Sequence, residues 1–177
     1  MSDAIITNDA KPVIRLIQAK DNAAVKQLVH DVLIEHGISG EGFAGVDPEM
    51  DDMFSAYQGP LTAYFVIEQA GEIVGSGGFA PLAGCEGEGI AELRKMYLRP
   101  GLRGQGWGHR LMIKCIEGAR QAGFKQMYLE TTPAMKAAQK LYLKHGFNYR
   151  ETRLGDTGHG GCEVLMSRHL RGQRTED

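Results

Sequence analysis

Apolar residues recur with two different periods along the chain, and each period predicts a different kind of element. After residue 21 they are spaced three and four residues apart, which places them on one face of an α-helix. These residues are Val25, Leu28, Val29, Val32 and Leu33. Asp21 or Asn22 can cap the start of this helix, and Gly37 can end it.

Three further stretches favour helices. Pro48 can start a short helix that runs to Tyr57. The stretch that follows Gly108 has Leu111, Cys115 and Ala119 on one face. A last helix opens at Pro133 and ends at Gly146. Its face is made of Ala138, Leu141, Tyr142 and His145.

Shorter apolar runs, bounded by glycine and polar residues, predict strands. They cover residues 13–17, 61–68, 72–79, 90–98, 127–130, 147–151 and 162–167. Hairpins join some of these strands, whereas a helix separates 90–98 from 127–130. This mixture predicts an α+β fold with a mixed, mostly antiparallel sheet of about seven strands and helices on both faces.

The strand at 90–98 changes the face on which its apolar residues fall. Ala91 and Leu93 are odd-numbered, whereas Met96 and Leu98 are even-numbered. Because side chains alternate between the two faces of a strand, this change requires one extra residue near position 94 or 95. A β-bulge supplies that residue. We therefore expect the sheet to be splayed between its fourth and fifth strands.

Length and composition suit one domain, expected at residues 12–170 between tails at 1–11 and 171–177. Of the 177 residues, 42% are hydrophobic and 24% are charged. The net charge of −2 predicts no general attraction to nucleic acid or to anionic membranes. The first eleven residues are polar, which argues against a signal peptide, and no apolar run has the length of a membrane span.

The three cysteines, at positions 85, 115 and 162, have no C-x-x-C spacing. We therefore expect reduced thiols, no metal site and a cytoplasmic protein. None of the three is close in sequence to the expected site, which disfavours a covalent acyl-enzyme.

A glycine-rich turn links the strand at 90–98 to the helix after it. Such a turn at a helix N-terminus exposes backbone N–H groups and binds anions, phosphate above all. The pattern G-x-x-x-x-G-K-[ST] does not occur, and G-x-G-x-x-G fails because His109 stands where a glycine is needed. The pattern present is R-x-x-G-x-G, carried by Arg103, Gly106 and Gly108.

This pattern resembles the acyl-coenzyme A signature of the GNAT superfamily of N-acetyltransferases. About thirty residues later, A-x-x-L-Y-x-x-x-G-F resembles the second motif of that superfamily, and it is carried by Ala138, Leu141, Tyr142, Gly146 and Phe147. The two motifs in this order cover roughly residues 61–151. Their resemblance implies a GNAT-like sheet whose bulged strand binds the pantetheine arm.

The resemblance also implies acetyl-CoA as acyl donor and a primary amine, on a small molecule or a protein, as acceptor. The attack is direct, in a ternary complex, and similar folds are commonly homodimers. The expected cofactor-binding residues are Met96, Tyr97, Leu98, Arg103, Gly104, Gln105, Gly106, Trp107, Gly108 and His109. The superfamily often has an asparagine before the last long helix, but Ala134 and Met135 stand here.

Two residues are candidates for proton transfer. Tyr142 matches the tyrosine that the superfamily places beside the cofactor sulfur, where it serves as general acid; the alternative is a core tyrosine bonded to a carbonyl. Glu92 matches a strand glutamate that some members use as base; the alternative is that it only binds substrate or lines the cleft. Glu130 is the reserve base.

The acceptor side has no recognisable motif. His159 lies in a glycine-rich loop and either contacts the acceptor or is simply solvated. The acidic residues between 41 and 52 either attract an amine or are solvated surface, and we favour the surface. They are Glu41, Asp47, Glu49, Asp51 and Asp52. Lys140 and Lys144 either lie near the end of the ligand or are merely exposed, and we favour the second interpretation. The alternative function is a non-catalytic acyl-CoA-binding or regulatory domain.

Overall fold

The computed structural model describes residues 10–170, which form one seven-stranded sheet flanked by helices. The spatial order of the strands is β1-β2-β3-β4-β5-β7-β6. The strands are β1 (Val13–Leu16), β2 (Ala63–Gln69), β3 (Glu72–Pro81), β4 (Ile90–Leu98), β5 (Gln126–Thr131), β6 (Asn148–Arg150) and β7 (Val164–His169). Among the strands of residues 10–170, only β4 and β5 pair in parallel, so the sheet is mixed and mostly antiparallel, as the sequence predicts.

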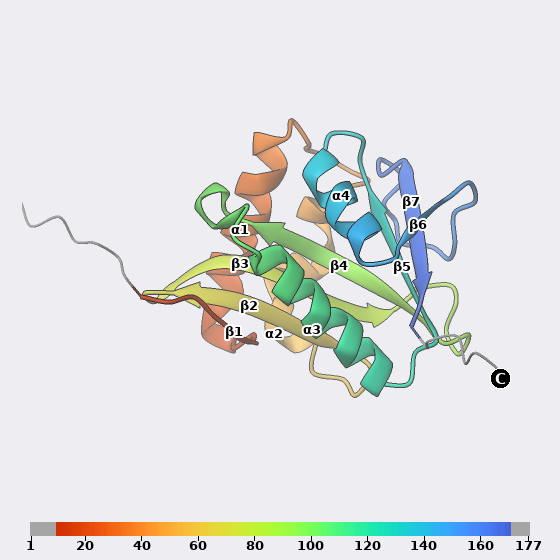
Figure 1. Cartoon of the computed structure of the whole chain (residues 1–177), viewed down its shortest axis with the longest axis horizontal. Coiled ribbons are helices and arrows are strands. Elements are labelled where there is room, and N and C mark those ends of the chain that lie inside the picture. Colours follow the sequence, from red (N-terminus) through yellow and green to blue (C-terminus); the bar gives the residue numbers. More distant parts are fainter. Residues whose placement is uncertain (1–9, 171–177) are drawn as a thin grey trace, which may run out of the picture.

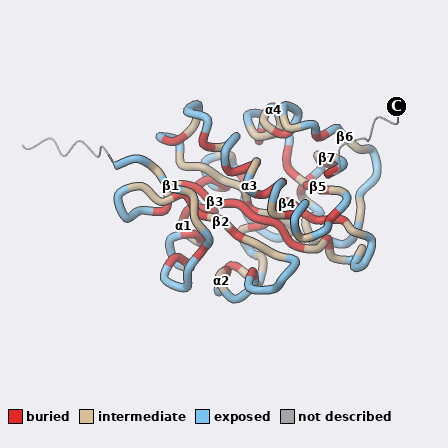
Figure 2. Tube along the Cα trace, turned by 60° about the horizontal axis from the view of Figure 1, so that its bottom comes forward, coloured by how far each residue is buried: buried red, intermediate tan, exposed pale blue. Residues whose placement is uncertain are grey.

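The main helices cover both faces of this sheet (Figure 1). They are α1 (Asn22–Glu35), α2 (Met53–Ala56), α3 (Trp107–Gln121) and α4 (Lys136–Lys144). Alternate residues of β2 face different helices, as the period of two requires. Tyr64 and Val66 pack with the buried face of α1, whereas Ile67 packs with Leu111 of α3. Buried residues accordingly concentrate in the central strands (Figure 2).

The expected bulge is present in β4. Ser76 pairs with Tyr97 and Gly78 with Arg94, so Gly77 alone lies opposite both Lys95 and Met96. Lys95 is the extra residue, and its φ of 47° is in the left-handed region. Its carbonyl oxygen lies 2.9 Å from the hydroxyl of buried Tyr64.

The sheet opens directly beyond this point. β4 pairs with β5 only from Ile90 to Glu92, opposite Gln126 to Tyr128. Beyond Glu92 the two strands separate, and no strand within residues 10–170 pairs with the β5 side of β4 there. The change of face read from the sequence and the predicted splay are both confirmed.

Two local predictions are wrong. Asp21 stands at the start of α1 but makes no side-chain cap, because Arg15 and the Gln18 N–H bind its carboxylate at 2.7 to 3.0 Å. Asn22 instead accepts a hydrogen bond from the Phe54 N–H at 2.8 Å. Pro133 does not open α4, which begins three residues later, after a turn closed by the Met135 N–H and the Thr132 carbonyl.

The stretch expected as one helix from 48 to 57 is two short turns, a 3₁₀ turn at Pro48–Asp51 and then α2. Most of the two predicted tails, residues 1–9 and 171–177, lies outside the described residues. Within residues 10–170, no helix has the length and apolarity needed to span a membrane.

Candidate active site

An open groove of about 660 Å³ lies where β4 ends, between the start of α3 and the face of α4. We call it the α3–α4 groove. Its floor is the β4 segment Met96–Leu98, and its sides are the glycine-rich loop and the α4 residues Ala138 and Leu141. Besides the phenols of Tyr97 and Tyr142, the polar side chains that line it are basic or imidazole groups, and no carboxylate lines it within the described part of the chain. The basic and imidazole groups are His36, Arg103, His109, Lys140 and Lys144.

The loop presents backbone N–H groups to this groove. Gly104 and Gly106 have φ values of 74° and 84°, which glycine adopts readily and other residues do not. The first backbone bond of α3 runs from the Arg110 N–H to the Gly106 carbonyl, so the N–H groups of residues 107–109 have no partner inside the helix. This helix end can therefore bind an anion.

Gly108 sets how closely α3 approaches the groove. A Cβ atom at this position would lie 3.1 Å from a methyl group of Leu98 and 3.2 Å from one of Leu141. These contacts are tighter than ordinary packing, so a side chain here would require the two methyl groups to shift by a few tenths of an ångström. The last glycine of the R-x-x-G-x-G pattern thus allows α3 to pack closely against Leu98 and Leu141.

Arg103 fixes the loop by its side chain. Its Nε donates to the Leu98 carbonyl at 3.0 Å, and its two terminal nitrogens contact the Glu35 carboxylate at 2.6 and 2.9 Å. The guanidinium therefore ties the loop to β4 and α1. These contacts use three of the five guanidinium N–H groups, so Arg103 fixes the loop and keeps two N–H groups beyond these contacts.

Two of the ten expected cofactor-binding residues do not line the groove. Trp107 is 9% exposed and packs with Ile67 and Leu111, and the Arg110 guanidinium lies 4.6 Å from its ring centre. Gln105 donates to the Gly101 carbonyl at 2.7 Å. The other eight line the groove.

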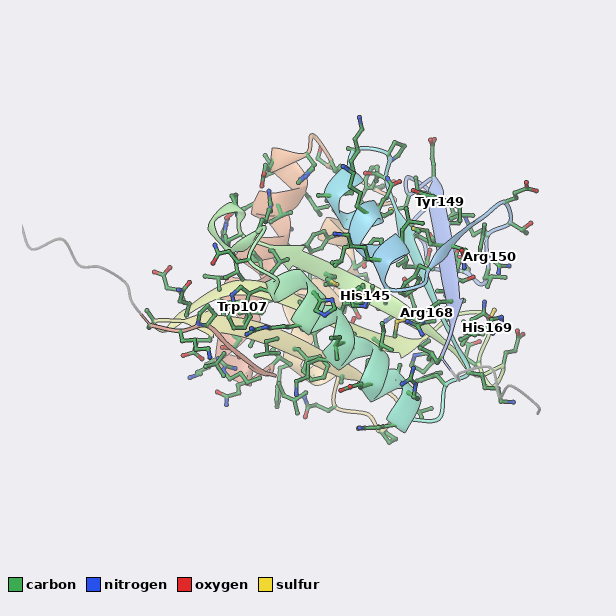
Figure 3. All side chains as sticks on the ribbon, viewed as in Figure 1. Trp107, His145, Tyr149, Arg150, Arg168 and His169 are labelled. Carbon is green, nitrogen blue, oxygen red and sulfur yellow. The ribbon has the colours of Figure 1, made fainter. Side chains whose placement is uncertain are left out.

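His109 has a contact that the sequence did not suggest. Its Nδ1 lies 2.9 Å from the Nε2 of His145, which points toward α3 from the end of α4 (Figure 3). Burial, His109 and Arg168 together lower the pKa of His145.

A second, small pocket of about 50 Å³ continues from the groove into the gap between β4 and β5. We call it the inner pocket. Residues lining both cavities mark the junction, and they are Met96, Tyr97, Met135, Ala138 and Tyr142. The wall toward α1 is apolar and includes Ile38 and Phe43, whereas the wall toward the sheet carries charged groups.

Tyr142 stands at the junction with its side chain packed as in a core. It is 6% exposed, and its ring centre lies 6.0 Å from that of Phe147. Its hydroxyl has no hydrogen-bond partner among residues 10–170, so the carbonyl partner of the alternative interpretation is not found there. Burial raises the pKa of this hydroxyl, which therefore keeps its proton at neutral pH.

Glu92 lies in the inner pocket and is 3% exposed. Its Oε2 accepts a hydrogen bond from the Arg94 Nε at 2.7 Å. Burial raises its pKa, and the positive charge of Arg94 only partly opposes this. The reserve candidate Glu130 also lines the pocket, but Tyr128, Arg153 and Thr157 all donate to its carboxylate.

Lys95, the bulged residue, is a part of the site that the sequence analysis missed. Its side chain is 1% exposed, and its Nζ contacts Asp47 at 2.6 Å and also Glu49. Burial by itself would raise the pKa of Asp47. A hydrogen bond from His159 and the positive charge of Lys95 outweigh burial, so the pKa of Asp47 is lowered. The change of face in β4 could have predicted this role, because the extra residue of the bulge places one more side chain in the pocket.

The five acidic residues expected near the acceptor separate into two groups. Asp47 and Glu49 bind Lys95, so these two belong to the site and are not merely solvated surface. Asp51 pairs with Lys26 on the surface, Asp52 caps α2 through the Ser55 N–H, and Glu41 is exposed.

Cys162 also lines the inner pocket, although no cysteine is close in sequence to the expected site. The loop before β7 folds back over the end of β5, so residues distant in sequence meet there. Arg153 of this loop donates to both the Cys162 carbonyl and the Glu130 carboxylate. Burial raises the pKa of the Cys162 thiol to about 11. The neighbouring Thr132 hydroxyl is buried and has no partner in the described structure.

Comparison with known proteins places these cavities in a family context. Residues 33–147 match the Acetyltransferase (GNAT) family. The chain is 43% identical over 160 residues to a protein of Escherichia coli (strain K12) named Uncharacterized N-acetyltransferase YjgM, which covers 90% of this chain and 95% of that protein.

Two solved structures agree in fold. An acetyltransferase of the GNAT family from Staphylococcus aureus Mu50 superposes with a TM-score of 0.75 at 18% identity, over 91% of this chain and all of that chain. YncA from Salmonella typhimurium, solved with its cofactor acetyl-CoA, has a TM-score of 0.71 at 22% identity, over 95% of this chain and 99% of that one.

Proposed function

The chain belongs to the acetyltransferase (GNAT) family and is an acetyl-CoA-dependent N-acetyltransferase, and we propose that it acetylates a small primary amine by direct attack in a ternary complex. One observation carries this proposal. A groove suited to an anionic nucleotide meets, at Tyr142 and Met96, a small pocket with a buried carboxylate. A binding module would need only the groove.

The α3–α4 groove fits coenzyme A in three respects. Its charged side chains are all positive, its free N–H groups lie at a helix N-terminus, and its volume is in the range of ligand clefts. The pyrophosphate would bind the N–H groups of residues 104–109, and the pantetheine arm would bind the unpaired side of β4 at Met96–Leu98. When bound, acetyl-CoA supplies the acetyl group as a thioester at the junction.

The bulge would supply the donor for the thioester oxygen. We assign this role to the Met96 N–H, because no strand of the described part of the chain pairs with the β5 side of β4 at that point. A preorganised N–H of this kind typically contributes a factor of about 100 or more. The buried Thr132 hydroxyl, without a partner in the described structure, is a second group that a ligand at the junction can satisfy.

Tyr142 and Glu92 would then move protons. The Tyr142 hydroxyl holds its proton at neutral pH and can give it to the departing sulfur. Glu92 can accept a proton from the acceptor, because burial raises the pKa of its carboxyl group. An alkyl ammonium with a pKa near 10.4 costs about 4 kcal/mol to deprotonate at neutral pH, so a base is needed.

Cys162 does not change the proposed route. With a pKa of about 11, roughly one thiol in ten thousand is ionised at pH 7, and the thiolate is the nucleophile. Direct attack therefore stays our proposal over an acyl-enzyme. Mass spectrometry after incubation with acetyl-CoA alone should find no acetylated Cys162, and its stable acetylation would contradict direct attack.

The size of the inner pocket bears on the acceptor. About 50 Å³ holds only a few atoms, so a small amine or the first residue of a peptide fits better than a bulky substrate. The free thiols fit a reducing cytoplasm, which we propose as the location. A homodimer stays a prediction, and sedimentation analysis is its test.

Two measurements test the function. Calorimetry should detect coenzyme A binding, and release of free thiol across a panel of amines should detect turnover. A non-catalytic acyl-CoA-binding or regulatory domain would give the binding signal without turnover for any amine. Turnover with a short-chain amine, lost when the amine is quaternised, is the expected result.

A further inference from the structure

The imidazole of His159 is held in the inner pocket by contacts on several sides. Its Nε2 lies 2.9 and 3.0 Å from the two carboxylate oxygens of Asp47. Its backbone N–H donates to the Thr157 hydroxyl at 3.1 Å, and its carbonyl accepts from Arg153. The side chain is 12% exposed, so His159 is a built part of the pocket and not a solvated loop residue.

Asp47 determines which ring nitrogen of His159 carries the proton. A carboxylate accepts hydrogen bonds, so Nε2 must donate to it, and Nδ1 has a lone pair whenever the ring is neutral. Nδ1 lies 4.0 Å from Oε1 of Glu92. The other Glu92 oxygen is already bonded to Arg94, so Oε1 is the oxygen that remains for a ligand.

The gap of 4.0 Å is too long for a direct hydrogen bond, but it suits one bridging group. A nitrogen or a water at about 2.8 Å from both atoms would reach Oε1 and Nδ1 together. Both residues line the inner pocket, which meets the α3–α4 groove at Tyr142. A bridging amine would therefore lie in the pocket next to the junction.

We propose that His159, held by Asp47, is the second proton acceptor of this site, and that the proton leaving the acceptor amine comes to rest on its Nδ1. This rests on the proposed function. One N–H bond of the ammonium breaks and leaves its electron pair on the amine nitrogen. The proton passes to Glu92 Oε1 or a bridging water and then to Nδ1, and the imidazolium later returns it to solvent.

The charges around His159 suit this role. Burial lowers the pKa of His159, and the positive charge of Lys95 acts in the same direction. The hydrogen bond and charge of Asp47, with a smaller effect of Glu92, raise this pKa. The raising effects are larger, so the pKa of His159 is raised. Arg153, which lies in the same loop, contacts the carbonyl oxygen of His159 and not its ring in the described structure. Because the neutral ring is the acceptor, kcat/KM should fall as pH falls through this raised pKa.

A purely structural role is the alternative, in which the contact with Asp47 only fixes the loop before β7. The two roles differ in pH dependence. Turnover follows the ionisation of His159 if the ring accepts the proton, but not if the contact only fixes the loop. Asp47 also binds Lys95, so its substitution needs a control that disturbs Lys95 equally. Glu49 provides this control, since it binds Lys95 and has no contact with His159 in the described structure.

The experiment measures pH–rate profiles for wild type, His159→Asn, Asp47→Asn and Glu49→Gln, with coenzyme A binding by calorimetry as the second readout. For His159→Asn we expect a loss of about 100-fold in kcat and an unchanged coenzyme A affinity, with the wild-type acidic limb replaced by the titration of Glu92 alone. Asp47→Asn removes a charge that raises the His159 pKa, so its acidic limb should move to lower pH. Glu49→Gln should keep the wild-type limb.

Three outcomes would overturn the proposal. The first is full turnover and an unchanged profile in His159→Asn. The second is a loss of turnover in this variant with the acidic limb retained at its wild-type pH. The third is an equal shift in Asp47→Asn and Glu49→Gln, which would assign the effect to Lys95. Absence of turnover in the wild type across all amines would instead contradict the proposed function.

Discussion

The α3–α4 groove and the inner pocket meet at Tyr142, yet the chain builds them in different ways. About half of the residues that line the groove come from one continuous stretch, residues 96–109, which offers backbone N–H groups. The pocket depends on side-chain contacts between residues far apart in sequence. Lys95 binds Asp47 across 48 positions, and Asp47 binds His159 across 112. Local sequence specifies the first cavity, and tertiary contacts specify the second.

The two cavities also differ in charge. The groove has positive side chains and no carboxylate among the described residues that line it, which suits a polyanion. In the pocket each positive group has a carboxylate beside it: Lys95 has Asp47 and Glu49, and Arg94 has Glu92. A pocket with balanced charges attracts an amine weakly by long-range electrostatics. Its selectivity must come from size and from the few groups that face the acceptor.

The largest expected effect comes from breaking the ion network of the pocket. Lys95→Met keeps the length and the Cβ of the bulged residue but leaves Asp47 and Glu49 without their shared cation. Removing one partner of a buried ion pair typically costs about 3–5 kcal/mol. We expect the low end of this range, since His159 and Tyr57 still bind the two carboxylates. Urea unfolding measures the change.

Lys140→Met is the matched control, because it removes an exposed lysine from the groove. It should leave the free energy of unfolding within about 0.5 kcal/mol of wild type. If Lys95→Met proves as stable as this control, the pocket carboxylates do not need Lys95. The contrast between a locally specified groove and a network-dependent pocket would then fail.

The same contrast explains how much the sequence could predict. The strands, the helices and the splay follow from apolar periodicity, and the bulge follows from the change of face between Leu93 and Met96. The groove follows from R-x-x-G-x-G. These signals are local, so they can be read without knowing the tertiary fold, although competition from Arg15 made the Asp21 cap prediction wrong.

The inner pocket could not be predicted in this way. Asp47 and His159 come from two glycine-rich loops without periodicity, and these loops meet only in the folded chain. The Gly161 N–H donates to the Gly42 carbonyl at 3.2 Å. A Cβ on Gly161 would lie 2.4 Å from the Phe43 ring, so close contact of the loops requires glycine there. Nothing in either loop alone indicates its partner.

The next effect concerns the junction, where the two cavities share Tyr142. Tyr142→Phe keeps the ring that packs against Phe147 and deletes only the hydroxyl, which has no protein partner in the described structure. Stability and coenzyme A affinity should therefore change little. Loss of general-acid help should lower turnover by about 100-fold. Initial rates with saturating acetyl-CoA give the measurement.

Acyl donors with a more acidic thiol should show a smaller loss, because their sulfur needs the proton less. This dependence on the leaving group separates an acid from a packing residue. Full turnover with a melting temperature several degrees lower would identify Tyr142 as a core residue only. The junction would then belong to the groove alone.

The smallest effect tests whether the groove acts through its backbone. Gly106 has a φ of 84° and stands immediately before α3, and a Cβ there would meet no atom within 4 Å. Gly106→Ala therefore adds no clash, and its consequence is backbone strain of about 1 kcal/mol. The loop can relieve this strain by turning its N–H groups away from the groove, so coenzyme A should bind several-fold more weakly.

Calorimetry measures this change, and Gly101→Ala is its control, because Gly101 has neither a positive φ nor an atom within 4 Å of its Cβ position. Since neither substitution changes a charge, a loss confined to Gly106→Ala would assign affinity to the shape of the loop. Equal affinities in the two variants would assign it instead to the lysines and imidazoles, and both cavities would then depend on side chains.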